Sequence, residues 1–157
     1  MNGAGDDIQD LYRALILEHA RAPRNFGRLD EATHTAEGIN PLCGDKLRLY
    51  LCVDDEDRIV NLGFEGSGCA ISVASASLLT ETLCGSSVAD ARSCFDAVTH
   101  RLTAKSPGDD TTTGIDISAL RALDGVRQHP SRVKCATLAW HALHAALEHS
   151  PITATTE

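Results

Sequence analysis

Three strand-like segments follow one another near residues 33–40, 46–54 and 58–65, and only short links separate them. The polar run Asp54-Asp55-Glu56-Asp57 joins the second segment to the third and is typical of a hairpin loop. A parallel pair would need a crossover of about a dozen residues or more, which these links cannot supply. The segments therefore predict an antiparallel three-stranded meander and exclude a βαβ unit in this part of the chain.

Helical patterns lie on both sides of this meander. Apolar residues recur at three- to four-residue spacing from Asp7 to about Ala22, and Pro23 ends that helix. After the strands, a stretch rich in Ser and Ala predicts a closely packed helix at 71–83, and further helices are expected at about 88–102, 117–123 and 133–148. The prediction is an α+β domain in which helices cover a small antiparallel sheet.

Composition limits the compartment and the partners. At 157 residues with 43% hydrophobic content, the chain suits one domain over residues 1–157, with flexible ends at about 1–6 and 150–157 and a polar loop at 105–114. It shows no basic-then-apolar leader and no apolar run of about 18 residues, so we expect a soluble cytoplasmic protein with no membrane role. The formal net charge of −8 argues against a nucleic-acid partner, which needs a basic surface.

The six cysteines are the main candidates for chemistry. Without a secretory leader, metal binding or redox chemistry is a better expectation than disulfides. No Cys-x-x-Cys pair occurs, which excludes zinc ribbons and thioredoxin-like chemistry. Cys52, Cys84 and Cys94 lie in strand-like or helical stretches, where a packing role is the simpler interpretation.

The other three cysteines have settings suited to a shared site. Cys43 and Cys69 lie in glycine-containing turns before and after the hairpin, and an antiparallel arrangement makes those two ends neighbours. We expect Cys135 near the start of the last helix, whose N-terminus would have to reach the same edge and would favour a thiolate there. Soft tetrahedral metals take thiolates from separate chain segments, so the three cysteines predict a metal site, with zinc as the metal.

Asp45 follows Cys43 by two residues and is the candidate fourth ligand. A carboxylate is a weaker zinc ligand than a thiolate and suits a site that must exchange a ligand. Two simpler alternatives stay open. Asp45 could only fix the turn, because Asp is common beside glycine in turns, and the three cysteines could be unrelated to one another.

Several motifs resemble those of the NifU/IscU/SufU proteins of iron–sulfur cluster assembly. The opening signature consists of Leu11-Tyr12, Ile16, Glu18-His19, Pro23-Arg24-Asn25 and Gly27. Two cysteine motifs match as well, Asn40-Pro41-Leu42-Cys43-Gly44-Asp45 and Gly68-Cys69-Ala70-Ile71-Ser72, followed by Ala74-Ser75-Ala76-Ser77. The resemblance covers residues from about 8 to 148 and implies the SufE/NifU-like sandwich of that family.

The segment around Cys135 indicates a branch of the family. Scaffold members of the IscU type are known for a His directly before the third cysteine, and here that position holds Lys134. The stretch from Arg132 to Trp140 is similar to the SufU version. The resemblance therefore implies a SufU-type zinc-dependent sulfurtransferase, with zinc held by Cys43, Asp45, Cys69 and Cys135.

The resemblance also implies a partner and a mechanism. The partner would be a SufS-type cysteine desulfurase, which forms a persulfide on its own cysteine with its own pyridoxal phosphate. On docking, a desulfurase side chain would take a place on the zinc and release Cys43, whose thiolate would accept the terminal sulfur and carry it to a SufBCD-type scaffold. Separately from the resemblance, we hypothesise that Arg132 is a second catalytic residue, which would orient Asp45 or steady the emerging negative charge.

Two other functions use the same residues. The chief alternative is a scaffold that assembles and transfers a two-iron, two-sulfur cluster on Cys43, Cys69 and Cys135, with iron as the bound metal. The missing His before Cys135 argues against it. The other is a structural zinc module without sulfur transfer, in which Cys43→Ser would affect stability alone.

Overall fold

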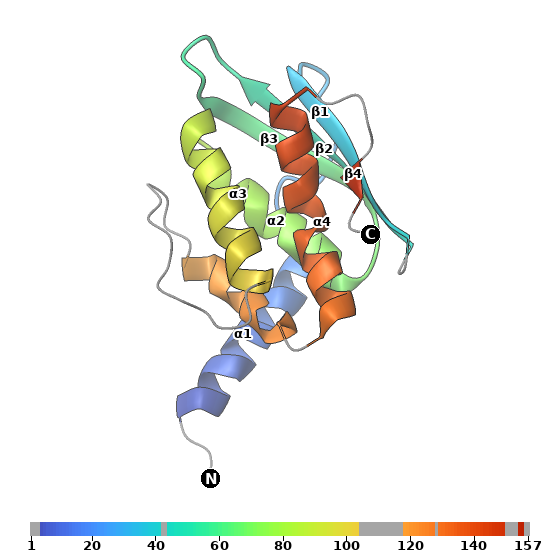
Figure 1. The fold of residues 1–157 in the computed structure, drawn as a ribbon, viewed down its shortest axis with the longest axis vertical. Helices are drawn as coiled ribbons and strands as arrows, with labels where there is room; N and C mark the ends of the chain where they lie inside the picture. Colours follow the sequence, from blue (N-terminus) through green and yellow to red (C-terminus); the bar gives the residue numbers. More distant parts are fainter. Residues whose placement is uncertain (1–3, 42–43, 104–117, 128, 150–153, 156–157) are drawn as a thin grey trace.

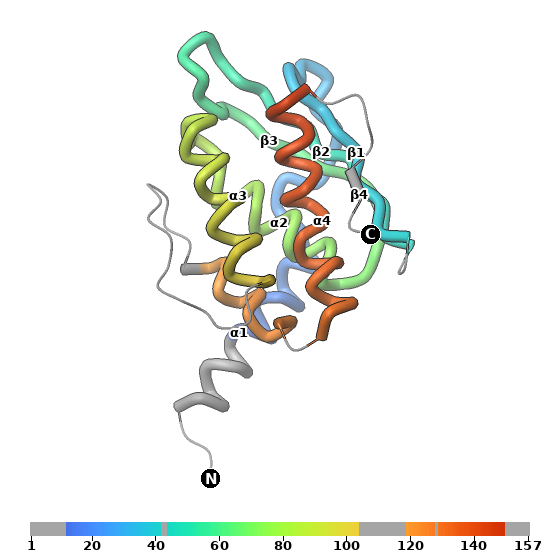
Figure 2. The backbone as a smooth tube through the Cα atoms, in the orientation of Figure 1, coloured from blue at the N-terminus to red at the C-terminus, as the bar shows by residue number. Residues whose placement is uncertain are grey.

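The computed structural model describes residues 4–41, 44–103, 118–127, 129–149 and 154–155 (Figure 1), with side chains described in these ranges except at 4–11, 118 and 154–155. Figure 2 traces the same backbone. The elements are α1 (Ala4–Arg21), β1 (His34–Asn40), β2 (Asp45–Val53), β3 (Ile59–Ser67), α2 (Ala70–Leu83), α3 (Val88–Thr103), the 3-10 helix η1 (Ser118–Val126), α4 (Pro130–Leu147) and β4 (Ala154–Thr155). In the described part of the chain, no helix is both long and apolar enough to cross a membrane. The polar loop expected at 105–114 lies outside the described residues.

The sheet has the strand order β3-β2-β1-β4. β1 pairs antiparallel with β2, ending with Asn40 opposite Asp45, and β2 pairs antiparallel with β3. The α+β fold with a three-stranded antiparallel sheet is thereby confirmed. The short strand β4, which the sequence did not predict, adds to β1 in parallel at Gly38 and Ile39.

The main helices lie on one side of this sheet (Figure 1). α4 packs across β1 and β2, α2 packs beside it and against β3, and α1 and α3 pack onto these two helices. Alternate residues of β2, which are Leu47, Leu49 and Leu51, are buried in the core that the sheet shares with the helices. Because alternate residues of a strand share a face, this pattern aligns β2 with its helical cover.

α2 is the central helix, and its small side chains allow close packing on several sides. Its buried residues include Ser72, Ala74, Ser75, Ala76 and Ser77. Ser75 Oγ donates a hydrogen bond to the carbonyl oxygen of Ala136 and accepts one from Trp140 Nε1 at 3.1 Å. These bonds join α2 to α4 within the core.

The segment after α1 runs along the outer edge of β3. The N–H of Gly27 donates a hydrogen bond to the carbonyl oxygen of Phe64 at 2.7 Å. The N–H of Phe64 in turn donates one to the carbonyl oxygen of Asn25 at 3.2 Å. Gly63 allows this close approach, because a Cβ there would lie 2.7 Å from the carbonyl oxygen of Gly27. Both edges of the sheet are therefore partly paired.

A buried histidine joins α1 to α2. His19 is 2% exposed, and its Nδ1 lies 2.7 Å from Ser77 Oγ. Ser77 Oγ also accepts the backbone N–H of Arg24 at 2.8 Å, which fixes the hydroxyl beside the ring. The other ring nitrogen, Nε2, faces Glu81 at 3.8 Å. Burial lowers the pKa of His19, and the nearby Arg24 adds to this against the opposing charge of Glu81.

The lowered pKa predicts a loss of stability in mild acid. The unfolded chain takes up a proton on His19 near the usual pKa of 6.5, whereas the folded chain takes it up only at lower pH. Stability is thus fully present above pH 6.5 and falls as the pH drops toward the folded pKa. In urea unfolding between about pH 7.5 and 5.5, His19→Gln should lose less free energy of unfolding than the wild type.

The matched control is His100→Gln, which alters an exposed residue of α3. The control should keep the full pH dependence of the wild type. If the free energy of unfolding fell equally steeply with decreasing pH in His19→Gln and in the wild type, this account of His19 would be contradicted.

Candidate metal centre

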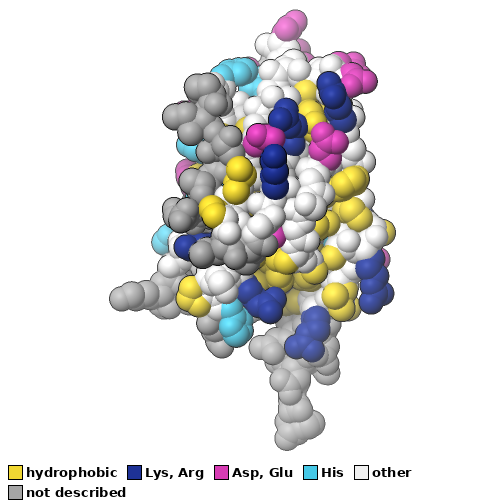
Figure 3. Space-filling model, turned by 90° about the vertical axis from the view of Figure 1, so that its right-hand side faces the viewer, with side chains coloured by type: hydrophobic (Ala, Val, Ile, Leu, Met, Phe, Trp, Pro, Cys, Tyr) yellow, Lys and Arg dark blue, Asp and Glu magenta, His cyan; other side chains and the backbone are white. Residues whose placement is uncertain are grey.

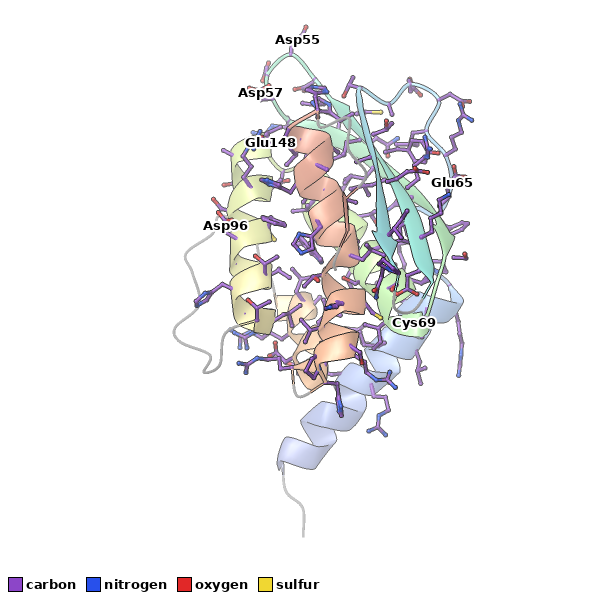
Figure 4. The ribbon with its side chains drawn as sticks, turned by 45° about the vertical axis from the view of Figure 1, so that its right-hand side comes forward. Asp55, Asp57, Glu65, Cys69, Asp96 and Glu148 are labelled. Atoms are coloured by element: carbon purple, nitrogen blue, oxygen red, sulfur yellow. The ribbon has the colours of Figure 1, made fainter. Side chains whose placement is uncertain are left out.

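Three of the four predicted ligands come together at one end of the sheet. One ligand atom from each of Asp45, Cys69 and Cys135 lies within 4.8 Å of the others. Asp45 begins β2, Cys69 directly precedes α2, and Cys135 lies on α4. In Figure 4, Cys69 lies near the lower end of the sheet, opposite the β2–β3 hairpin at the top. Cys43 lies outside the described residues, so its part in the site stays a prediction.

Asp45 interrupts an apolar pattern. It shares the core-facing side of β2 with Leu47 and Leu49, and it is 0% exposed. A buried carboxylate is unfavourable unless hydrogen bonds replace the water that it loses. The position of Asp45 therefore depends on the donors around it.

Those donors come from several elements. Asp45 Oδ1 accepts the backbone N–H of Cys69 at 2.8 Å, and Oδ2 accepts the hydroxyl of Ser72 at 2.7 Å and Asn40 Nδ2 at 3.4 Å. Burial acts to raise the pKa of Asp45, but hydrogen bonds from Ser72, the Cys69 backbone, Cys135 and Asn40 outweigh it and hold the pKa below its usual value. The carboxylate is thus ionised at neutral pH.

Cys69 reaches the site because of its place before α2 and the glycine that precedes it. Cys69 is the N-cap residue of α2, and its side chain makes no capping hydrogen bond. The positive end of a helix dipole favours negative charge at such a position. A Cβ at Gly68 would lie 2.6 Å from Asp45 Oδ1, so glycine leaves the space that the carboxylate occupies.

Cys135 lies deeper in its helix than the sequence indicated. α4 begins at Pro130 instead of near Val133, because proline fits the first position of a helix. Cys135 is consequently in the second turn, and the dipole effect predicted for its thiolate fades within the first turn. Its place in the site comes from packing: the residue is 2% exposed, and its sulfur accepts Asn40 Nδ2 at 3.5 Å.

Close packing of α4 on β1 brings Asn40 and Cys135 together. A Cβ at Gly38 would lie 3.0 Å from Leu138 Cδ1, so glycine lets the helix approach the strand at this point. Asn40 follows Gly38 by two residues on the same side of β1, and Cys135 precedes Leu138 by about one helical turn. The contact at Gly38 therefore sets the distance between Asn40 and Cys135.

The sequence did not identify Asn40 and Ser72 as neighbours of the ligands. Both lie in the cysteine motifs, but no role follows from the motifs alone. Ser72 follows Cys69 by three residues, which on a helix is the same side. Asn40 could have been found only with the strand register, which places it opposite Asp45.

Arg132 is exposed in the first turn of α4. It is not among the groups that hold Asp45, which are Ser72, the Cys69 backbone, Cys135 and Asn40. Its proposed action on developing charge stays a prediction.

The remaining described cysteines lie elsewhere and are not part of the cluster. Cys94 is 0% exposed, and burial raises its pKa to about 12, so its thiol is an apolar packing group. Cys84 is exposed and Cys52 is half-buried.

The donor set fits a soft divalent metal ion. Bonds of about 2.0–2.3 Å place the ligand atoms of tetrahedral zinc about 3–4 Å apart. The 4.8 Å limit on the three described ligand atoms needs only a small contraction to reach that spacing. An ionised carboxylate beside two thiols is also a charge arrangement that a cation stabilises.

The protein-family model for the NifU-like N terminal domain matches residues 11–107 of the sequence, which is more than half of the chain. The chain belongs to the NifU-like family. This is a family of iron–sulfur cluster assembly proteins, and the resemblance expected from the motifs is confirmed.

Individual relatives carry different names. The chain is 38% identical over 137 residues to the zinc-dependent sulfurtransferase SufU of Bacillus subtilis (strain 168), covering 87% of this chain and 89% of that protein. It is 34% identical over 143 residues to the iron–sulfur cluster assembly scaffold protein IscU of Streptococcus pyogenes serotype M1, covering 91% and 86%. The solved structure of FiSufU from Fervidobacterium islandicum AW-1, named as an assembly scaffold for the SUF system, matches with a TM-score of 0.73 and 31% identity, covering 85% and 93%.

The close contact between Gly68 and Asp45 predicts the effect of adding a methyl group at residue 68. Gly68→Ala should displace the Asp45 carboxylate, because the added Cβ would lie 2.6 Å from its Oδ1. We expect the variant to retain less zinc than the wild type when metal content is measured after purification from zinc-containing medium. Gly125→Ala is the control, since a Cβ there meets nothing within 4 Å. Equal zinc in Gly68→Ala and wild type would contradict the geometry described.

Proposed function

We propose that this protein is a zinc-dependent sulfur acceptor of iron–sulfur cluster assembly, which takes sulfur from a SufS-type cysteine desulfurase on Cys43 and delivers it to a SufBCD-type scaffold. The observation that carries the proposal is the cluster of Asp45, Cys69 and Cys135, in which Asp45 follows Cys43 by two residues in the sequence. Similarity to a relative named a zinc-dependent sulfurtransferase supports it. Lys134, in the position where scaffolds of the IscU type have His, supports the same choice.

Cys43, Asp45, Cys69 and Cys135 would hold the zinc. When bound, zinc favours deprotonated thiols and has no redox chemistry of its own. Ser72 and Asn40 keep Asp45 ionised and fixed in place by their hydrogen bonds. The half-buried Cys69 brings the site to the protein surface, where a partner can reach it.

The chemical step belongs to Cys43. Its thiolate attacks the terminal sulfur of the partner's persulfide, and a new sulfur–sulfur bond forms as the old one breaks. The partner's cysteine leaves as a thiolate, and Cys43 becomes the persulfide. The terminal sulfur keeps its oxidation state, so the transfer needs no oxidant or reductant.

The surface supports docking of a protein at this end of the molecule. Figure 3 shows hydrophobic side chains gathered in the lower half of one face, with Lys and Arg side chains at their margin. Cys69 lies toward the same end (Figure 4). Apolar surface with a charged margin is typical of protein–protein contacts.

The alternative is a scaffold that builds a two-iron, two-sulfur cluster on Cys43, Cys69 and Cys135. Similarity to a relative named as an IscU scaffold favours it. In that case iron and sulfide would be the cargo of the same site.

Desulfurase stimulation tests the proposal. We expect the zinc form to increase turnover of a SufS-type desulfurase on free cysteine, and we expect metal-free protein and Cys43→Ala to give the rate of the desulfurase alone. The control Cys84→Ala removes an exposed thiol outside the cluster and should stimulate like wild type. No stimulation by the zinc form, with a stable cluster chromophore after anaerobic loading of iron and sulfide, would support the scaffold.

The role of Arg132 is tested by removing its charge. If Arg132 steadies the developing thiolate, Arg132→Gln should slow sulfur transfer to Cys43 while zinc content stays unchanged, because Arg132 is not among the groups that hydrogen-bond to Asp45. Sulfur on Cys43 is measured by mass spectrometry after rapid mixing with the persulfide form of the desulfurase. Transfer at the wild-type rate would exclude a role for the charge.

A further inference from the structure

Two polar side chains each contact Asp45 and one of the cysteines. Asn40 Nδ2 lies 3.4 Å from Asp45 Oδ2 and 3.5 Å from Cys135 Sγ. Ser72 Oγ lies 2.7 Å from Asp45 Oδ2 and 3.6 Å from Cys69 Sγ. Asn40 thus connects the carboxylate to the cysteine of α4, and Ser72 connects it to the cysteine before α2.

The burial of Asn40 lowers the stability of the fold. It is 0% exposed, and its Oδ1 has no hydrogen-bond partner among the described residues. A buried carbonyl without a donor is unfavourable, and an apolar residue would avoid this. The two N–H protons of the amide, however, can serve Asp45 and Cys135 at once, which no apolar side chain can do.

The hydrogen bonds also limit how Asp45 can bind a metal. A carboxylate has about four lone-pair positions, and Oδ2 uses two of them for Asn40 and Ser72 while Oδ1 uses one for the N–H of Cys69. The fourth position accepts the proton of the Cys135 thiol. A metal ion that bound Cys135 as a thiolate would remove this proton and free the position, so the carboxylate has room for a single metal–oxygen bond.

We propose that Asn40 and Ser72 are positioning residues of the metal centre: they hold Asp45 as a one-oxygen ligand at fixed positions relative to Cys135 and Cys69. The inference rests on the metal site of the proposed function, but it does not depend on sulfur transfer. Groups that hydrogen-bond to metal ligands orient them and tune their affinity.

Cobalt binding tests this directly, because Co²⁺ replaces zinc in such sites and its visible absorption reports the number and geometry of its ligands. The variants are Asn40→Ala and Ser72→Ala. The control is Ser77→Ala, which also removes a fully buried hydroxyl of α2, but one that contacts His19 and Arg24 instead of the ligands. Metal-free proteins are titrated with Co²⁺ without oxygen against a competing chelator, and their thermal unfolding is recorded in parallel.

We expect Asn40→Ala and Ser72→Ala each to bind Co²⁺ about 10- to 100-fold more weakly than wild type. Their ligand-field bands should weaken relative to the sulfur-to-cobalt bands, because Oδ2 becomes free to bind as a second oxygen and raises the coordination number. Ser77→Ala should match the wild type in affinity and spectrum, whatever its loss of thermal stability.

Wild-type affinity and spectrum in Ser72→Ala would overturn the proposal, and so would an equal loss in Ser77→Ala. If Asn40→Ala does not fold, Ser72→Ala decides the question with the same two readouts. Wild-type protein that binds no Co²⁺ also overturns it. Wild-type protein that binds Co²⁺ but never accepts sulfur would defeat the proposed function and leave the inference in place.

Discussion

The buried carboxylate of Asp45 is the group around which this end of the molecule is built. Its hydrogen bonds come from β1, from the start of α2 and from α4, so the charge is stable only when all three elements lie close to β2. Glycines at 38 and 68 supply the space for that approach. The small residues of α2 and the bonds of Ser75 then hold the two helices together behind the site. The need of the buried Asp45 carboxylate for hydrogen-bond donors thus accounts for much of the packing at this end of the sheet.

The same arrangement explains how a buried carboxylate can lie beside two cysteines. Cys135 and Ser72 both serve as donors to Asp45. A metal ion would bind the cysteines as thiolates and remove the Cys135 proton from this set, so binding must release protons. The hydrogen bonds of Asn40 and of the Cys69 backbone need no such proton and can persist in both states. These two bonds therefore hold Asp45 whether or not the Cys135 thiol carries its proton.

Periodicity and turn chemistry were sufficient to predict the meander and the main helices, whereas the meeting of Cys69 with Cys135 was expected only on the hypothesis of a shared metal site. These features depend on patterns that are local in the sequence, such as the alternating leucines of β2. The roles of Asn40 and Ser72 depend on register and on the distance between a strand and a helix, which no local pattern contains. α4 starts at Pro130, three residues before the start that the apolar pattern predicts, because proline favours the first position of a helix. β4 is two residues long, too short to show alternation.

The pairing at the two edges of the sheet limits how other molecules can add strands to it. A strand edge with free N–H and C=O groups is a template for adding a strand from another molecule, and such additions lead to aggregation. Here β4 occupies part of the β1 edge, and the backbone around Phe26 occupies part of the β3 edge. Both covered stretches lie on strands that contribute to or adjoin the site. At these stretches other molecules meet side chains instead of free backbone N–H and C=O groups. This favours contacts that depend on side-chain fit over the addition of a strand from any other chain.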